Sequence, residues 1–163
     1  MARVKVRSGA AARAGYDEDF FAWTEEQARI LRGRDTLGLD WDNLAEEIAS
    51  MGRRDRRELE SRLRLILHHL LKWRAQPGLR GRSWQSTLRE QRRQAEKLLK
   101  ESPSLQLQVP ALIDEAYPDA RADALDETGL RPRTFPAECP FTIEQILDQQ
   151  YLPEEAAIAS DPD

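Results

Sequence analysis

The chain has 163 residues and a mass of 18.8 kDa, which is enough for one hydrophobic core but leaves little room for two. It carries 25 Lys and Arg against 29 Asp and Glu, a formal net charge of -4, and 40% of its residues are hydrophobic. The single cysteine excludes a disulfide-stabilised scaffold, and the absence of a run of about 18 apolar residues excludes a membrane-spanning protein. Both observations favour a cytoplasmic location.

Apolar residues recur every three to four positions along most of the chain, which predicts an all-α protein. We expect a helical bundle of about four main helices with extra short helices near the C-terminus. Residues 1–15 are basic and Ala-rich but lack the apolar core of a signal peptide, so they are predicted to form a flexible arm. Residues 16–152 are predicted to form a single helical domain, and residues 153–163 a disordered acidic tail.

The first helix is predicted over residues 17–32, with Asp17 or Asp19 as its N-terminal cap and Gly33 as its end. One face of this helix is predicted to be apolar. Its members are Phe20, Trp23, Gln27, Ile30 and Leu31.

A second helix is predicted to begin after Asp40, which caps it, and to break or kink at Gly52. Four of its residues are expected to face inward: Trp41, Leu44, Ala45 and Ile48.

A third helix, from residue 53 to about residue 76, has a seam with spacings of four, three, four and three, which is typical of a helix bundle. The seam consists of Leu59, Leu63, Ile66, Leu70 and Trp73. A fourth helix over residues 83–101, capped by Ser83, is predicted to pair with the third as an antiparallel hairpin. Gln91 lies among the apolar positions of the fourth helix, so its amide is expected to bond a side chain or backbone of a neighbouring helix.

Prolines divide the remainder into short pieces. Helices are predicted over residues 105–117 and, after Pro118, over residues 119–128, with Gly129 as a C-terminal cap. A last helix is predicted to begin at Thr142, which forms a capping box with Gln145.

Charge is distributed unevenly: residues 1–52 carry -3, residues 53–100 carry +10 and residues 101–163 carry -11. Two outward basic stripes on the predicted hairpin are candidates for binding an anionic partner such as nucleic acid. They contain Arg53, Arg57, Arg64, Arg89, Arg93, Lys97 and Lys100. The favoured alternative is that the acidic third packs across them, because the pI of about 5.4 lies far below that of a typical nucleic-acid domain.

No group of residues has the spacing of a catalytic or metal site, so the sequence predicts no catalytic residues, no metal and no cofactor. Adjacent His68 and His69 diverge by about 100° on a helix and cannot jointly hold one ion. Cys139 follows an acidic residue and is predicted to be a buried or half-buried thiol. The neighbouring carboxylates of Glu46 and Glu47 are explained most simply by their attraction to the positive, N-terminal end of the dipole of the second helix.

Several ordered blocks together resemble the bacterial domain-of-unknown-function family numbered 29, which occurs in cyanobacteria and proteobacteria. The blocks are DWDNLAEEI at 40–48, LRLILHHLLKW at 63–73, SW at 83–84, QR at 91–92, ESPSL at 101–105, ET at 127–128 and CPFT at 139–142. The resemblance implies an all-helical fold and no established activity. It also implies one family-defining region that contains His68, His69, Trp73, Trp84, Gln91 and Arg92.

The sequence favours a non-catalytic binding or regulatory module whose macromolecular partner engages the basic hairpin or an apolar groove beside it. The partner is expected to be a protein or a second copy, with nucleic acid less favoured and no membrane. One alternative is a hydrolytic or metal-assisted enzyme whose residues converge between the second and third helices. Its candidates are Glu46, Glu47, His68, His69 and Cys139. The other alternative is a homo-oligomer formed through leucines of the third helix.

Overall fold

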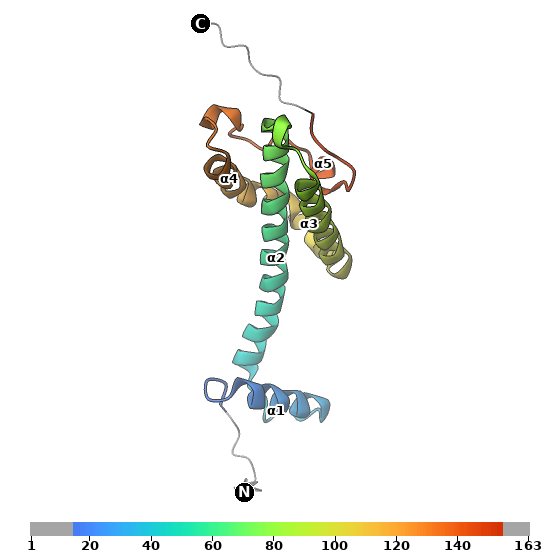
Figure 1. Ribbon diagram of the computed structural model, residues 1–163. Coiled ribbons are helices and arrows are strands. Elements are labelled where there is room, and N and C mark those ends of the chain that lie inside the picture. Colours follow the sequence, from blue (N-terminus) through green and yellow to red (C-terminus); the bar gives the residue numbers. More distant parts are fainter. Residues whose placement is uncertain (1–14, 155–163) are drawn as a thin grey trace, which may run out of the picture. The chain divides into compact units, whose positions relative to one another are not determined.

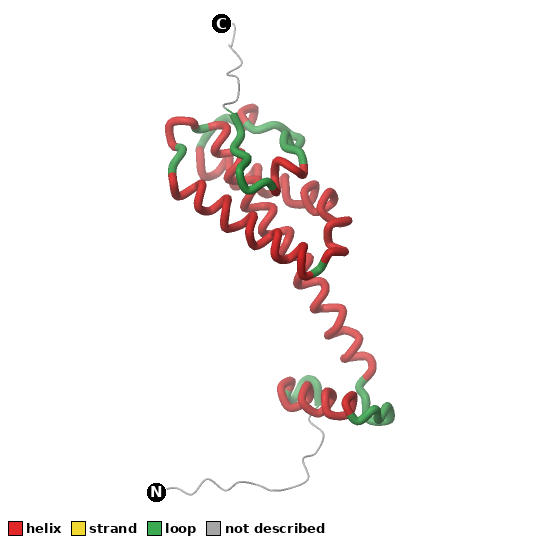
Figure 2. The backbone as a smooth tube through the Cα atoms, turned by 90° about the vertical axis from the view of Figure 1, so that its right-hand side faces the viewer, coloured by secondary structure: helices red, strands yellow, loops and turns green. Residues whose placement is uncertain are grey.

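The computed structural model describes residues 15–154, and contacts within the chain divide it into an N-terminal unit (Met1–Gly52) and a C-terminal unit (Arg53–Asp163). Over the described residues the chain forms helices and no strand, which confirms the prediction of an all-α bundle (Figure 2). A single domain over residues 16–152 stays a prediction. Apart from Gly15, Pro153 and Glu154, the predicted arm and tail lie outside the described residues.

The N-terminal unit contains α1 (Phe20–Arg32) and the beginning of α2 (Trp41–Ala75). Both predicted N-terminal caps are confirmed: Asp19 Oδ1 accepts a hydrogen bond from the Ala22 amide at 2.9 Å, and Asp40 Oδ1 accepts one from the Asn43 amide at 3.4 Å. Gly33 follows the last residue of α1, as predicted. Capping therefore fixes the loop between the two helices at both of its ends.

α2 runs without interruption through 35 residues, so of the predicted break or kink at Gly52 the break is wrong and the kink stays a prediction. A glycine in a helix costs only about 1 kcal/mol relative to alanine, and the helix continues through it. The chain nevertheless divides into its two units immediately after Gly52.

In the C-terminal unit, α3 (Arg82–Glu101) lies alongside α2 and runs in the opposite direction (Figure 1). Asp55 pairs with Ser102, Arg62 with Gln91 and Lys72 with Trp84, so residue numbers fall on α3 as they rise on α2. These contacts confirm the predicted antiparallel hairpin. A turn containing η1 (Pro77–Leu79) joins the two helices.

The N-terminal cap of α3 is Gly81 and not Ser83, so that part of the prediction is wrong. The helix begins at Arg82, one residue before Ser83, and Ser83 already lies within its first turn. Serine is strongly preferred at N-caps and glycine less so, which is why the pattern placed the boundary two residues too late.

α4 (Val109–Thr128) follows η2 (Pro103–Gln108) and is one continuous helix with Pro118 inside it. The prediction of two helices separated at Pro118 is wrong. Proline removes one backbone hydrogen bond, but Ala116, Tyr117 and Ala120 around it are buried in the core and hold the helix together. Gly129 ends α4 at a φ of 65°, as its predicted role as a left-handed cap requires.

The last elements are η3 (Pro132–Thr134) and α5 (Ile143–Leu147), and Thr142 and Gln145 form the predicted capping box at the start of α5. The core of the C-terminal unit contains four of the five residues of the seam predicted on α2, Leu59, Leu63, Ile66 and Leu70, which are fully buried. The fifth, Trp73, is also buried but is not part of that core cluster. Within residues 15–154, no helix combines the length and apolar character that crossing a membrane requires.

Two glycine substitutions test this account of the helices. Gly52→Ala is expected to raise the free energy of unfolding by about 0.5–1 kcal/mol, because the added methyl group meets nothing within 4 Å and alanine favours a helix. Gly129→Ala is expected to lower it by about 1 kcal/mol, because alanine tolerates a φ of 65° poorly. Chemical denaturation measures both, and a loss of stability in Gly52→Ala would contradict a continuous α2.

Candidate functional site

Acidic residues of α4 pair with basic residues of α2 along one edge of the C-terminal unit. Arg64 donates from Nε and Nη2 to the two carboxylate oxygens of Asp123, at 2.7 and 2.8 Å. Arg56 donates from Nη2 alone to both carboxylate oxygens of Glu115, also at 2.7 and 2.8 Å. The paired residues are 59 positions apart in both cases, so α2 and α4 run parallel there. The acidic third of the chain therefore lies against Arg64 of the predicted basic surface and against Arg56, which the prediction did not include.

The α3 side of that surface remains exposed, and acidic residues on the same helix face it. Arg93 pairs with Glu90 at 2.8 Å, Lys100 with Glu96 at 2.6 Å and Lys97 with Glu101 at 3.8 Å. Arg93 lowers the pKa of the Glu90 carboxyl to about 2. Arg53, Arg57 and Arg89 are also exposed. Binding of an anion by this surface stays a prediction, and much of its charge is balanced by acidic neighbours.

Lys72 is the centre of a polar cluster in the C-terminal unit. Its side chain is only 4% exposed, its Nζ donates a hydrogen bond to Glu127, and it lies 4.4 Å from the ring centre of Trp84. This hydrogen bond is the main reason that the pKa of the Glu127 carboxyl is lowered. A buried ammonium is stable only with such partners, so the three side chains form a structural unit that joins α2, α3 and α4.

His68 and His69 lie beside this cluster. His68 Nε2 is 2.8 Å from Glu127 Oε2 but is not aligned for a hydrogen bond, and His69 Nδ1 donates to the Leu65 carbonyl at 2.9 Å. Burial lowers the pKa of both imidazoles, with further effects from Glu127 and Lys72. Among the described residues no group of three or more His, Cys, Asp or Glu is placed to hold a metal ion.

Arg92 is a buried cation, which the sequence pattern did not predict. The residue is 1% exposed, and its guanidinium donates to three backbone carbonyls, of Ile146 at 2.8 Å, Tyr151 at 2.8 Å and Gln145 at 3.0 Å. Burial lowers its pKa from the ordinary value, and Asp148 raises it. Arg92 therefore fastens α5 and the segment after it to α3.

The other residues of the family-defining region have structural contacts. Gln91 Oε1 accepts a hydrogen bond from Arg62 at 3.0 Å, as expected of an amide on an apolar face. Trp73 is buried, its carbonyl accepts from Arg80 Nε at 2.8 Å, and its ring lies 5.5 Å from the Arg80 guanidinium. Blocks of the motif that are far apart in sequence thus meet in the C-terminal unit.

The other residues proposed from the sequence as catalytic candidates, Glu46, Glu47 and Cys139, have described contacts that do not include the two histidines. Glu47 accepts a hydrogen bond from the Tyr16 hydroxyl, and Glu46 is exposed next to it, both in the N-terminal unit. Cys139 is half-buried, as predicted, and burial raises the pKa of its thiol. A raised pKa leaves little thiolate at neutral pH, which disfavours a nucleophilic role.

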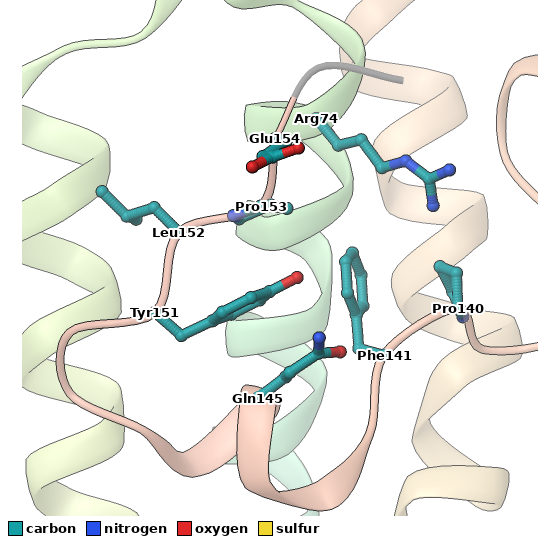
Figure 3. A pocket seen from close by; sticks show the side chains of 8 residues that line it. All are labelled: Arg74, Pro140, Phe141, Gln145, Tyr151, Leu152, Pro153 and Glu154. Atoms are coloured by element: carbon teal, nitrogen blue, oxygen red, sulfur yellow. The ribbon is translucent and has the colours of Figure 1, made fainter. Parts of the chain in front are cut away.

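A pocket of about 430 Å³ lies between α2 and the segment around α5 (Figure 3). The hydroxyl end of Tyr151 points toward the ring of Phe141, with Arg74 and Glu154 nearby. Because Arg92 holds the Tyr151 carbonyl, it also positions this wall of the pocket. None of the site residues predicted from the sequence lines the pocket.

The N-terminal unit exposes a set of large apolar side chains that the sequence interpretation expected to be mostly covered. Trp41 is 60% exposed and Ile48 is 68% exposed, and Ala45 is also exposed, so the prediction that these three face inward is wrong. We call the full set the N-terminal apolar surface. It comprises Phe20, Phe21, Leu31, Leu37, Trp41, Ile48 and Met51.

α1 covers only one side of the beginning of α2, and this explains the exposure. Trp23 Nε1 donates to Asp40 at 3.2 Å, and the Asp40 amide donates to Gln27 Oε1 at 2.8 Å. The buried residues of α1 are Trp23, Gln27 and Ile30. Two helices cannot enclose all the apolar positions that they carry, so the remaining faces stay in contact with solvent.

Residues 16–152 match a family model described as "Domain of unknown function DUF29". The match confirms the resemblance that the ordered motifs indicated. Neither a curated protein nor a solved structure matches the chain.

The burial of Arg92 predicts a large difference between neighbouring arginines. Arg92→Met is expected to lower the free energy of unfolding by about 3 kcal/mol, since it leaves three carbonyls without their donor. Arg93→Met, at a side chain that is 62% exposed, is expected to change it by less than about 0.5 kcal/mol. Urea denaturation compares the two, and equal effects would show that the Arg92 contacts contribute little.

The lowered pKa of both histidines predicts a pH dependence of stability. As the pH falls below the ordinary histidine value of 6.5, the unfolded chain takes up protons before the folded one, so stability is lost. We expect the free energy of unfolding to fall between pH 7.5 and pH 5.5, and to fall less in the variant His68→Asn/His69→Asn. Equal losses in the two proteins would assign the pH dependence to other groups.

Proposed function

The chain belongs to the DUF29 family, whose description names no activity, and for this member we propose a non-catalytic helical binding or regulatory module that engages a partner protein through its N-terminal apolar surface. The observation that carries this proposal is the exposure of seven large apolar side chains, three of them aromatic, within residues 20–51. Surfaces of this kind mark protein interfaces, and aromatic residues contribute most of the binding energy there.

The framework of the N-terminal unit supports this role because it presents the surface in one conformation. Tyr16 packs edge to face on Phe20 and Trp23, and its hydroxyl donates to Glu47 on α2. Trp23 in turn bonds Asp40 at the start of α2. A surface that is already ordered loses less conformational entropy when it binds.

The basic hairpin is the weaker candidate surface. Arg64 is engaged by Asp119 and Asp123, and Arg93, Lys97 and Lys100 have acidic partners on their own helix. A phosphate would have to compete with these carboxylates at each position. Nucleic acid is therefore the less favoured partner, and the single cysteine still favours a cytoplasmic location.

The two alternative functions gain no support. Of the leucines that the predicted third helix contributes, all but the half-buried Leu65 are buried in the chain's own core, which leaves a homo-oligomer little of the surface it was expected to use. Cys139 Sγ donates to the Phe141 carbonyl at 3.6 Å, and His68 and His69 have their described contacts with Glu127 and the Leu65 carbonyl. An enzyme that joins Cys139 to the histidines has no geometric basis in these contacts.

Site-specific photo-crosslinking tests the proposal. A benzophenone side chain replaces Phe21 (75% exposed) or, as a matched control in the C-terminal unit, Leu107 (87% exposed), in cells that naturally make the protein. We expect a cross-linked protein partner from position 21 and none from position 107. The same product from both positions, or none from either, would contradict the proposal, and a cross-link to a second copy would replace it with homo-oligomerisation.

A further inference from the structure

The N-terminal apolar surface has a regular arrangement on its helices. On α1, Phe20 and Leu31 are 11 residues apart, which is about three turns, so they share one face. On α2, Trp41 and Ile48 are 7 residues apart, about two turns, and Met51 lies close to the same face. Each of the two helices therefore presents part of its exposed apolar side chains along one face, against which the apolar face of another helix can pack.

The size of the surface matches what one partner contributes to a stable complex. An aromatic side chain carries about 150–250 Å², so the seven side chains at their observed exposures present on the order of 800 Å². One partner of a standard interface buries about 800 Å². The exposed apolar area of the N-terminal unit is therefore comparable with what one partner contributes to a standard interface.

The charge around this surface is strongly negative. Residues 15–52 contain 10 acidic and 3 basic residues, a formal charge of -7. Glu25 on α1 and Asp42 on α2 are exposed among the apolar residues. The part of the surface formed by residues 15–52 is therefore suited to a cationic partner, and two copies would bring two such charges together; the four basic residues at positions 1–14 bring the charge of residues 1–52 to -3.

Building on the function proposed above, we propose that the occupant of the N-terminal apolar surface is an amphipathic helix of a partner protein whose apolar stripe is flanked by Lys and Arg. The apolar stripe packs on Phe20, Phe21, Trp41 and Ile48, and the flanking cations meet the acidic rim of α1 and α2. Apolar contact supplies the affinity, and the opposite charges select this helix over acidic or neutral ones.

Titration of the full chain with three synthetic 18-residue peptides tests this inference, with sedimentation of the chain alone as a check on self-association. One peptide has a Leu stripe flanked by Lys, the second has the same stripe flanked by Glu, and the third keeps the Lys residues but replaces Leu by Ser. We expect the Leu/Lys peptide to bind at least tenfold more tightly than either of the others, and more weakly as the salt concentration rises.

Variants locate the binding site. Phe21→Ser/Ile48→Ser changes two exposed side chains and is expected to weaken binding of the Leu/Lys peptide at least tenfold, and Leu107→Ser is the control that leaves it unchanged. Glu25→Gln/Asp42→Asn is expected to reduce the dependence on salt without abolishing binding. These variants lie on exposed positions, and circular dichroism confirms that each is folded.

The outcomes separate this inference from the proposed function. Equal binding of the Leu/Glu peptide, binding of the Ser/Lys peptide, or equal loss in Leu107→Ser would overturn the cationic helix as occupant. A chain that sediments as a dimer, and as a monomer when it carries Phe21→Ser/Ile48→Ser, would make a second copy the occupant. Failure of every peptide together with a cross-link from position 21 would reject the chemistry of the partner while leaving the proposed function standing.

Discussion

The apolar residues of α2 need cover along the whole helix, and the described chain provides it over only part of that length. In the C-terminal unit, α3 and α4 bury Leu59, Leu63 and Ile66 completely. In the N-terminal unit, α1 packs on one side of α2 and leaves Trp41 and Ile48 in contact with solvent. Because apolar burial is the main source of folding stability, we expect the N-terminal unit to be less stable than the C-terminal unit when no partner is bound.

Charge has a structural function in the C-terminal unit. A hairpin of +10 meets a helix whose acidic residues recur every four positions, and Arg56 and Arg64 bind their partners on α4 at the same separation of 59 residues. Exposed pairs of this kind contribute about 1 kcal/mol or less each, so they orient α4 more than they stabilise it. Lys72 and Arg92 differ because they are buried. Removal of Arg92 would leave three backbone carbonyls without their donor, and the buried ammonium of Lys72 depends on Glu127 and Trp84.

Periodicity and capping residues predicted the helices, the hairpin and the half-buried Cys139, because each depends on nearby residues. A break did not occur at Gly52, because a helical glycine costs only about 1 kcal/mol. A break did not occur at Pro118 either, although a helical proline costs about 3 kcal/mol, because Ala116, Tyr117 and Ala120 around it are buried in the core. The burial of Arg92 was not predictable, because its acceptors are carbonyls more than 50 positions away. Trp41 and Ile48 were expected to face inward because their spacing is that of an apolar helix face. Spacing alone does not distinguish a face buried within the chain from one exposed on its surface, and both side chains are exposed.

Hydrogen–deuterium exchange along α2 of the free chain tests the central claim most directly, because one helix supplies both the covered and the uncovered stretch. We expect the amides of residues 45–52 to exchange at least a hundredfold faster than those of residues 59–71, because few buried contacts oppose local opening of residues 45–52. Equal protection along the whole helix, at a concentration where the chain is monomeric, would show that Trp41 and Ile48 need no partner and would contradict the account.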